Sequence, residues 1–113
     1  MKLVIAVIRP EKMDDVREAL VAAEITRITV TRATGHGQYL GEDLYRGQIH
    51  VPDLYPKVRL EIACNDEFVE IIIEAILKGA RQNGGKVGDG KIFVVPLEQC
   101  IRIRTGERGG SAI

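Results

Sequence analysis

The order of apolar and polar residues divides the chain into short alternating segments. Residues 3–8 form an unbroken apolar run rich in branched side chains, closed by Pro10, which is typical of a central strand covered on both faces. From residue 12 to residue 23 the apolar positions recur at helical spacing, and Asp14 and Asp15 stand near the positive end of that helix. The opening of the chain therefore predicts a strand followed by an amphipathic helix.

The rest of the chain repeats this alternation. The further elements that we expect are strands around 28–30, 57–64 and 91–96 and a helix over 68–80. Polar and apolar residues alternate almost strictly over 57–64, which predicts a strand with one buried face. Asn65 and Asp66 precede the second helix as candidate caps.

The order strand, helix, strand, long loop, strand, helix, strand fits within a single domain of residues 1–113. It predicts an α+β fold, a ferredoxin-like βαββαβ sandwich with both helices on one face of the sheet. Since the run at 3–8 is apolar on both sides, the other face needs a cover, and we expect a homo-oligomer to supply it. Ile101 and Ile103 alternate with arginines and predict a short extra strand in a C-terminal segment, residues 97–113.

Composition narrows the class of protein. With 113 residues, 45% of them hydrophobic and 28% charged, the chain can bury the core of one ordinary domain, which argues against disorder. Its 16 basic and 16 acidic side chains balance, which argues against a nucleic-acid partner. The balance is uneven, because residues 1–80 hold 10 basic and 13 acidic side chains whereas residues 81–113 hold 6 and 3. We interpret this basic C-terminal third as an indication of function.

The two cysteines, Cys64 and Cys100, have no short spacing and no paired histidine, so neither a zinc site nor a disulfide framework is indicated. We expect two buried, reduced thiols. The first apolar run meets Arg9 and Pro10 and is too short for a signal peptide or a membrane span. We therefore expect a cytoplasmic protein.

A loop from Thr34 to Pro56 separates the second and third predicted strands and is far longer than is usual inside a compact domain. Its glycines and prolines favour a flexible loop, and its tyrosines offer contact groups. We interpret this segment as a functional loop that can contact a partner. A merely tolerated insertion is the alternative, since loop length alone costs little free energy.

A second glycine-rich loop, residues 82–91, carries Lys86 and Lys91. The pattern Gly-x-x-x-x-Gly-Lys from Gly85 resembles the start of a P-loop, but Ile92 replaces the required Ser or Thr, and a strand follows in place of a helix. Glycines still allow consecutive backbone N–H groups to converge on an anion. The loop is therefore a candidate phosphate-binding loop.

Arg102 and Arg104 follow later in the chain, where one strand face would present two guanidinium groups to a polyphosphate. A hairpin turn with solvated basic side chains is the alternative. Together, the loop and the arginines make a phosphate chain a candidate ligand.

Three motifs stand in the chain in this order: Leu44-Tyr45-Arg46-Gly47, Gly88-Asp89-Gly90-Lys91-Ile92-Phe93-Val94 and Ile101-Arg102-Ile103-Arg104-Thr105-Gly106-Glu107. With Ile8-Arg9-Pro10 and residues 14–20, they resemble the P-II nitrogen-regulatory signalling proteins over essentially the whole chain. The resemblance implies a cytoplasmic homotrimer that binds adenine nucleotides, ATP or ADP with AMP as a further candidate, in clefts between subunits. It also implies that residues 36–55 are an effector loop, which regulates a target membrane transporter or metabolic enzyme, and that the protein acts in nitrogen regulation.

The resemblance also assigns residues. Those that match the family's phosphate loop and its phosphate-binding arginines are Gly88, Asp89, Gly90, Lys91, Arg102 and Arg104. Those expected along the rest of the nucleotide are Val7, Thr29, Gly35, His36, Gly37, Gln38, Ala63 and Val87. Arg9 and Lys57 match basic residues of a 2-oxoglutarate or anion site, and Gln38 joins this site if the loop shifts its register. The contact residues expected in the effector loop are Tyr39, Tyr45, Arg46 and His50.

The chain departs from the family pattern at the base of the effector loop. Gln38 and Tyr39 stand where the family has an Arg for the nucleotide and then a Gln for the Mg²⁺ that holds 2-oxoglutarate. The oxo-acid site therefore lacks a ligand unless Gln38 takes the metal position. His50 stands where uridylylated members carry a Tyr, so that switch is expected to be absent. We expect ATP or ADP as the effector ligand with Mg²⁺ as a candidate companion, and an adenylate sensor indifferent to 2-oxoglutarate is an alternative to a nitrogen sensor.

The histidines His36 and His50 lie near loop carboxylates, but their spacing fits no ligand motif, and we expect no bound metal. No Ser-His-Asp, Cys-His or carboxylate pair can be assigned, so we expect a protein that is not an enzyme. A metal-responsive adaptor of the same fold and a phosphoryl-transfer enzyme are the competing hypotheses.

Overall fold

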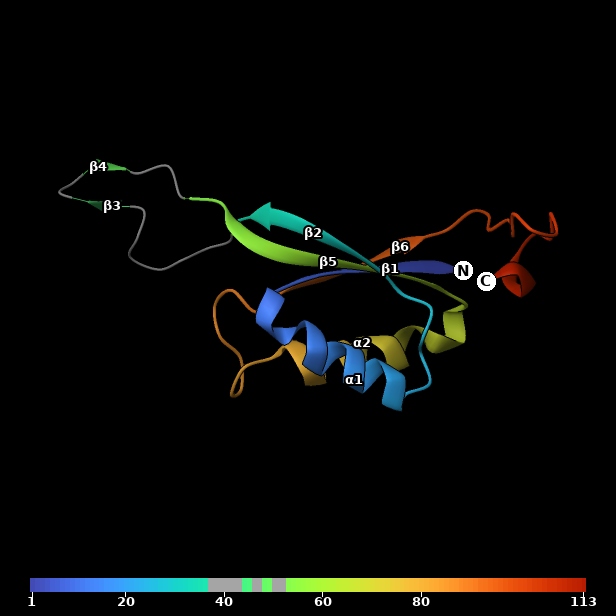
Figure 1. Ribbon diagram of the computed structural model, residues 1–113, viewed down its shortest axis with the longest axis horizontal. Helices are drawn as coiled ribbons and strands as arrows, with labels where there is room; N and C mark the ends of the chain where they lie inside the picture. The colour runs from blue at the N-terminus through green and yellow to red at the C-terminus, as the bar shows by residue number, and fades with distance from the viewer. Residues whose placement is uncertain (37–43, 46–47, 50–52) are drawn as a thin grey trace.

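A computed structural model describes residues 1–36, 44–45, 48–49 and 53–113. In chain order its elements are β1 (Lys2–Ile8), α1 (Met13–Ala22), β2 (Thr29–Gly35), β3 (Leu44–Tyr45), β4 (Gln48–Ile49), β5 (Tyr55–Cys64), α2 (Val69–Ala80) and β6 (Gly90–Pro96). Short 3₁₀ turns cover Pro10–Lys12, Asp66–Phe68 and Gly110–Ala112. The predicted α+β fold is confirmed, since both helices cover one face of a single four-stranded sheet (Figure 1).

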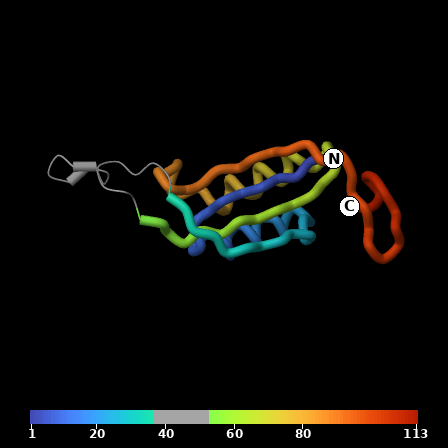
Figure 2. Tube along the Cα trace, turned by 90° about the horizontal axis from the view of Figure 1, so that it is seen from above, coloured from blue at the N-terminus to red at the C-terminus, as the bar shows by residue number. Residues whose placement is uncertain are grey.

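The sheet has the strand order β2-β5-β1-β6, and each neighbouring pair is antiparallel. Figure 2 shows the four strands side by side, with the helices behind them. This is the ferredoxin-like order that two βαβ halves in series predict. The ladder between β2 and β5 runs to the pair Gly35 and Tyr55, and β3 pairs with β4 between those two residues.

The hydrophobic core lies between the sheet and the helices. Its most deeply buried side chains are Val4, Ile8, Val16, Leu20, Leu60, Ile62, Ile72 and Ile76. Each such side chain stabilises the fold by about 1.5–3 kcal/mol when it is removed from water. The helical and strand periodicities therefore identified the core correctly.

The opposite face of the sheet is also apolar along its centre. Leu3 and Ile5 of β1 point to this face, and their partners in register on β6 are Val95 and Phe93. Phe93 is 48% exposed and Val95 41% exposed. No helix or strand of the described residues lies on this face (Figure 1). The expectation that β1 is apolar on both sides is confirmed.

The predicted caps of the second helix are wrong. Asn65 precedes the 3₁₀ turn before α2 but makes no side-chain cap; its Nδ2 donates to the Gly110 carbonyl at 3.1 Å. The Asp66 carboxylate accepts a hydrogen bond from the Met1 ammonium group at 3.0 Å. Both side chains are drawn into long-range contacts that local sequence does not reveal.

The C-terminal segment differs from prediction as well. In place of a strand over 101–104, Ile101 forms a single bridge with Arg108, and a turn lies between them. A strand needs a neighbouring strand for its backbone hydrogen bonds, and the main sheet ends at β6 without reaching this segment. The expected burial of the cysteines holds for Cys64, whereas Cys100 is only half-buried.

Candidate functional site

A cleft of about 460 Å³ opens where β1 and β2 end and β6 begins. Its volume lies within the range of small-molecule sites, about 300–1,000 Å³. The lining residues are Val7, Gly35, His36, Lys57, Lys86, Val87, Gly88, Asp89, Gly90, Lys91 and Phe93. Most of them are ligand residues expected from the sequence, and the fold brings them together from four separate segments.

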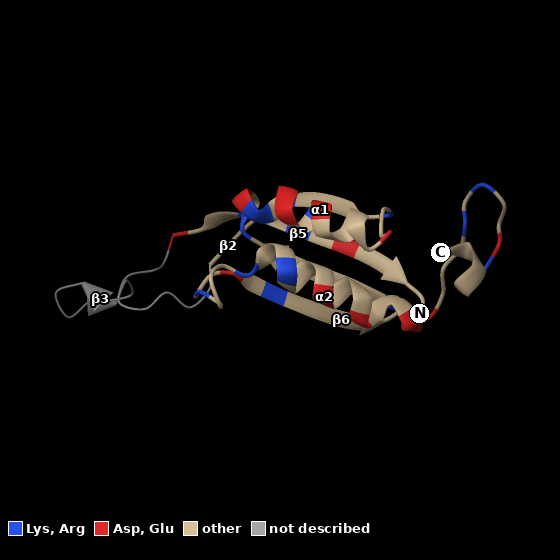
Figure 3. Cartoon of the chain, turned by 90° about the horizontal axis from the view of Figure 1, so that it is seen from below, with Lys and Arg blue, Asp and Glu red and all other residues tan. Residues whose placement is uncertain are grey.

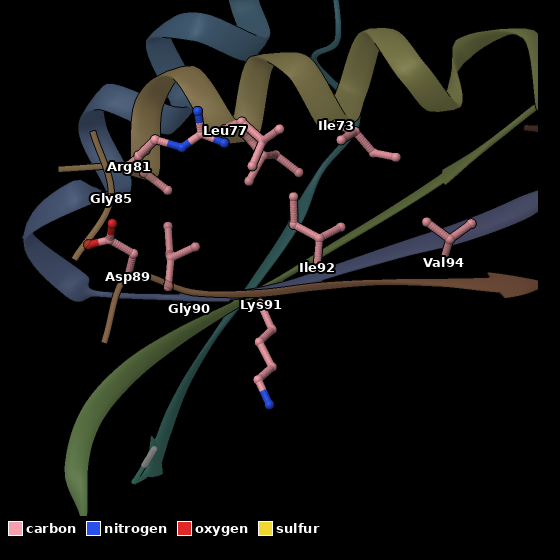
Figure 4. A pocket seen from close by; sticks show the side chains of 12 residues that line it. Ile73, Leu77, Arg81, Gly85, Asp89, Gly90, Lys91, Ile92 and Val94 are labelled. Atoms are coloured by element: carbon pink, nitrogen blue, oxygen red, sulfur yellow. The ribbon is translucent and has the colours of Figure 1, made fainter. Parts of the chain in front are cut away.

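The glycines of the phosphate loop are required by its backbone. Gly90 has φ +114°, and a Cβ there would collide with the Val7 carbonyl oxygen. Gly88 also lies in the left-handed region, with φ +96°. These conformations favour glycine and let the loop backbone pass close to β1. Lys91 then pairs in register with Val7, and its side chain points away from the helices (Figure 4).

Asp89 organises the loop from within. Its Oδ2 accepts hydrogen bonds from the backbone N–H of Lys86 at 2.8 Å and of Gln82 at 3.1 Å. The carboxylate is therefore turned toward the loop's own backbone, and it fixes the segment that carries the glycines. Sequence reasoning placed Asp89 on the nucleotide; the geometry gives it a role in positioning the loop.

Arg9 ties the same loop to the end of β1. Its Nη2 donates to the Val87 carbonyl at 2.7 Å, and its Nε lies 3.7 Å from Asp89 Oδ1. Both of these facing atoms, Nε and Oδ1, are buried and lack a hydrogen-bond partner in the described part of the chain. Arg9, which the sequence predicts at an anion site, therefore makes a structural contact that the sequence did not indicate.

The surroundings of Asp89 favour the charged form of its carboxyl group. Burial alone raises the pKa of its carboxyl, but the backbone donors of Lys86 and Gln82, followed by the charges of Arg9 and Lys12, outweigh this effect, and the pKa lies below its ordinary value. Asp89 is therefore a carboxylate at neutral pH.

The remaining nucleotide residues that the structure describes lie at the opposite end of the sheet. Ala63 pairs in register with Leu3, four positions along β1 from Val7, or about 13 Å at 3.3 Å per residue. Thr29 begins β2 at that end of the sheet, and the C-terminal segment extends beyond Pro96 from the same end (Figure 1). The predicted nucleotide residues thus form two groups within one chain.

The predicted phosphate arginines belong to this second group. Arg102 donates to the Glu107 carboxylate at 2.9 Å and to the Ser111 carbonyl at 3.1 Å. The intervening Ile103 is fully exposed, and Arg104 is also exposed. Within one chain the two arginines do not lie beside the glycine loop, and basic residues gather at both ends of the sheet (Figure 3). Arg102 and Arg104 therefore do not join Lys86 and Lys91 within a single chain.

Several predicted residues lie outside the described residues: Gly37, Gln38, Tyr39, Arg46 and His50. Tyr45 lies on β3. Within the described ranges, no three His, Cys, Asp or Glu side chains gather as metal ligands. In the same ranges no helix is long and apolar enough to cross a membrane.

Comparison with known proteins decides the family. The family model described as "Nitrogen regulatory protein P-II" matches residues 1–107. The chain belongs to this family.

It is 51% identical to the nitrogen regulatory protein P-II of Azospirillum brasilense over the full length of both chains. It is 50% identical to the nitrogen regulatory protein GlnK1 of Methanosarcina mazei, over all of this chain and 97% of that relative. A P-II protein of Pasteurella multocida is likewise 50% identical over the full length of both. The chain is thus a member of a nitrogen-regulatory signalling family, as its motifs indicated.

Proposed function

We propose that the protein is a cytoplasmic, non-catalytic regulator that binds ATP or ADP and controls a target transporter or metabolic enzyme. The observation that carries this proposal is the cleft itself. It combines a glycine loop with positive-φ backbone, the cations Lys86, Lys91 and Lys57, and the apolar walls Val7 and Phe93. Such a loop and cations suit a phosphate chain, and apolar walls suit a nucleoside. AMP would engage fewer of these cations and should bind more weakly.

We further propose that each nucleotide site is completed by a neighbouring copy in a homotrimer. The cleft lies at one end of the sheet, whereas Ala63, Arg102 and Arg104 lie at the other. A second copy that supplies its C-terminal end to the first copy's cleft would join the two groups. Repeated around a ring, this head-to-tail contact closes with cyclic symmetry. The uncovered apolar sheet face gives the copies a surface to bury.

The regulatory output would pass through residues 36–55. Gly35 and His36 line the cleft at the end of β2, so a ligand there touches the base of the effector loop. Ligands that differ in their phosphates would favour different conformations of this loop by making different contacts. The substitutions Gln38 and Tyr39 support an adenylate sensor indifferent to 2-oxoglutarate as the second candidate.

Calorimetric titration tests nucleotide binding. ATP, ADP and AMP are each titrated into the full chain, with and without Mg²⁺ and 2-oxoglutarate. We expect saturable ATP and ADP binding that weakens about 10- to 100-fold in Lys91→Gln, because a charged hydrogen bond to phosphate is lost. Lys78→Gln, on the exposed side of α2, should leave affinity unchanged. Absence of any adenine-nucleotide binding by the wild type refutes the proposal. Enhancement of ATP binding by 2-oxoglutarate would favour the nitrogen sensor over the adenylate sensor.

A mixing experiment tests the shared site. Lys91→Gln chains and Arg102→Ala/Arg104→Ala chains should each bind ATP weakly alone. After the two are denatured and refolded together, about a quarter of the inter-subunit sites in a ring combine an intact loop with intact arginines. Recovery of that fraction of tight sites is expected, whereas no recovery would contradict a site built from two copies.

A further inference from the structure

A second hollow lies on the helix side of the sheet. It has a volume of about 430 Å³ and is bounded by α2 and β6. Figure 4 shows Ile73 and Leu77 of α2 facing Ile92 and Val94 of β6 across it, while the Lys91 side chain points to the other side of the strand. This groove and the nucleotide cleft therefore lie on opposite sides of β6.

The groove exists because the helices do not cover the edge of the sheet. β6 is the last strand in the order and pairs only with β1 among the described strands. Its Val94 lies in register with the fully buried Val4, on the helix side, yet is 42% exposed. The apolar core therefore continues into an open groove at this edge. Exposed apolar surface that lines a concave site is typical of ligand-binding grooves.

One end of the groove carries an unmatched positive charge. Arg81 follows α2 directly and is exposed, and its guanidinium group takes part in none of the hydrogen bonds or ion pairs among the described residues. The other charged group at this end, Asp89, already accepts two backbone hydrogen bonds and faces Arg9. An anionic head group at Arg81 would therefore complete the charge balance.

The length of the groove limits the apolar part of a ligand. The wall formed by α2 and the residue after it runs from Ile73 to Arg81, eight residue steps or about 12 Å at 1.5 Å per step. A straight alkyl chain of about eight to ten carbons, with bonds of about 1.5 Å, spans this length. A single guanidinium group balances one negative charge, whereas a phosphate monoester brings about −1.5 to −2.

We propose that this groove binds a medium-chain carboxylate, with its carboxylate on Arg81 and its alkyl chain between α2 and β6. The groove shares Asp89, Gly90 and Lys91 with the nucleotide cleft but opens on the helix side of β6, and the proposal stands whether or not ATP binds in the cleft. Its chemistry is that of a small amphipathic ligand: burial of methylene groups supplies most of the affinity, and the guanidinium group fixes the orientation.

Calorimetry with sodium decanoate, octanoate and hexanoate, each below its micelle-forming concentration, tests the proposal on the full chain. Affinity should fall about tenfold for each two carbons removed, because each buried methylene contributes about 0.8 kcal/mol. Arg81→Gln should weaken decanoate binding about tenfold, and Lys78→Gln, a matched loss of a cation from the end of α2, should not.

Methyl NMR spectra locate the bound chain. The resonances of Ile73, Ile92 and Val94 should shift on addition of decanoate, while those of Leu3 and Ile5 on the uncovered sheet face should not. The proposal is overturned if decanoate gives no saturable binding, if Arg81→Gln and Lys78→Gln behave alike, or if only the sheet-face methyls respond. Circular dichroism of both variants should match the wild type, so that a loss of binding is not a loss of fold.

Discussion

Replacing Asp89 by alanine removes the group that holds the phosphate loop in place. The carboxylate side chain is 16% exposed and accepts the backbone N–H groups of Lys86 and Gln82 at 2.8 and 3.1 Å. Without it, these two donors must turn to water or remain unpaired. We expect the loop to lose its fixed geometry while the sheet and helices remain folded.

The expected loss of stability in Asp89→Ala follows from these two hydrogen bonds. A hydrogen bond to a charged group contributes about 1.5–3 kcal/mol, and Lys86 is exposed, so its N–H group can regain water. Two such bonds give about 3–6 kcal/mol, so the loss of unfolding free energy in Asp89→Ala should lie near the lower end of this range, about 3 kcal/mol. Asp89→Asn keeps an acceptor oxygen but loses the charge, and about half of that loss is expected.

The pH dependence has a definite sign. Because the pKa of Asp89 is lower in the folded chain than its unfolded value of about 3.9, the stabilisation is complete above that value. It is lost as the pH falls through the lowered folded pKa. The difference in unfolding free energy between wild type and Asp89→Ala should therefore narrow on acidification.

Two measurements check this reasoning. Urea denaturation at fixed protein concentration, at pH 7 and below pH 4, gives the free-energy difference; the concentration is fixed because assembly contributes to stability. Hydrogen exchange at the Lys86 and Gln82 amides reports the loop directly, and their protection should fall in Asp89→Ala. Equal denaturation midpoints at pH 7 together with unchanged amide protection would refute the assigned role.

Three further predictions concern packing and thiol chemistry. Gly79→Ala should destabilise the chain by about 1–2 kcal/mol in urea denaturation, because the new Cβ would lie 2.5 Å from the α1 backbone. This overpacking outweighs the gain in helix propensity of about 1 kcal/mol. A stabilised variant would contradict the prediction. Gly90→Ala should lose tight ATP binding, since φ +114° and the Val7 carbonyl exclude a side chain; unchanged calorimetric affinity would contradict it. Burial raises the pKa of the Cys64 thiol, so iodoacetamide should label Cys64 more slowly than half-buried Cys100 at pH 8. Mass spectrometry measures the two labelling rates, and equal rates would contradict the prediction.

Local patterns determined most of the fold. The periodicities of 3–8, 57–64 and 68–80 predicted two strands and a helix. The ends of these elements in the structure lie within two residues of the predicted ends. This succeeded because a strand or helix with one buried face must place apolar residues at its own period. The caps failed because the Asn65 and Asp66 side chains contact residues far away in the sequence. The strand at 101–104 failed because no strand of the described residues pairs with it.

The sequence by itself determined the family, the two-layer architecture and the residue types suited to a phosphate chain. Only the tertiary structure decided which of them meet. It joined Val7, Gly35 and Lys91 in one cleft and left Arg102 at the far end of the sheet. It also turned Asp89 into the loop. Distances between segments depend on strand register and on the direction of each side chain, and a one-dimensional pattern contains neither.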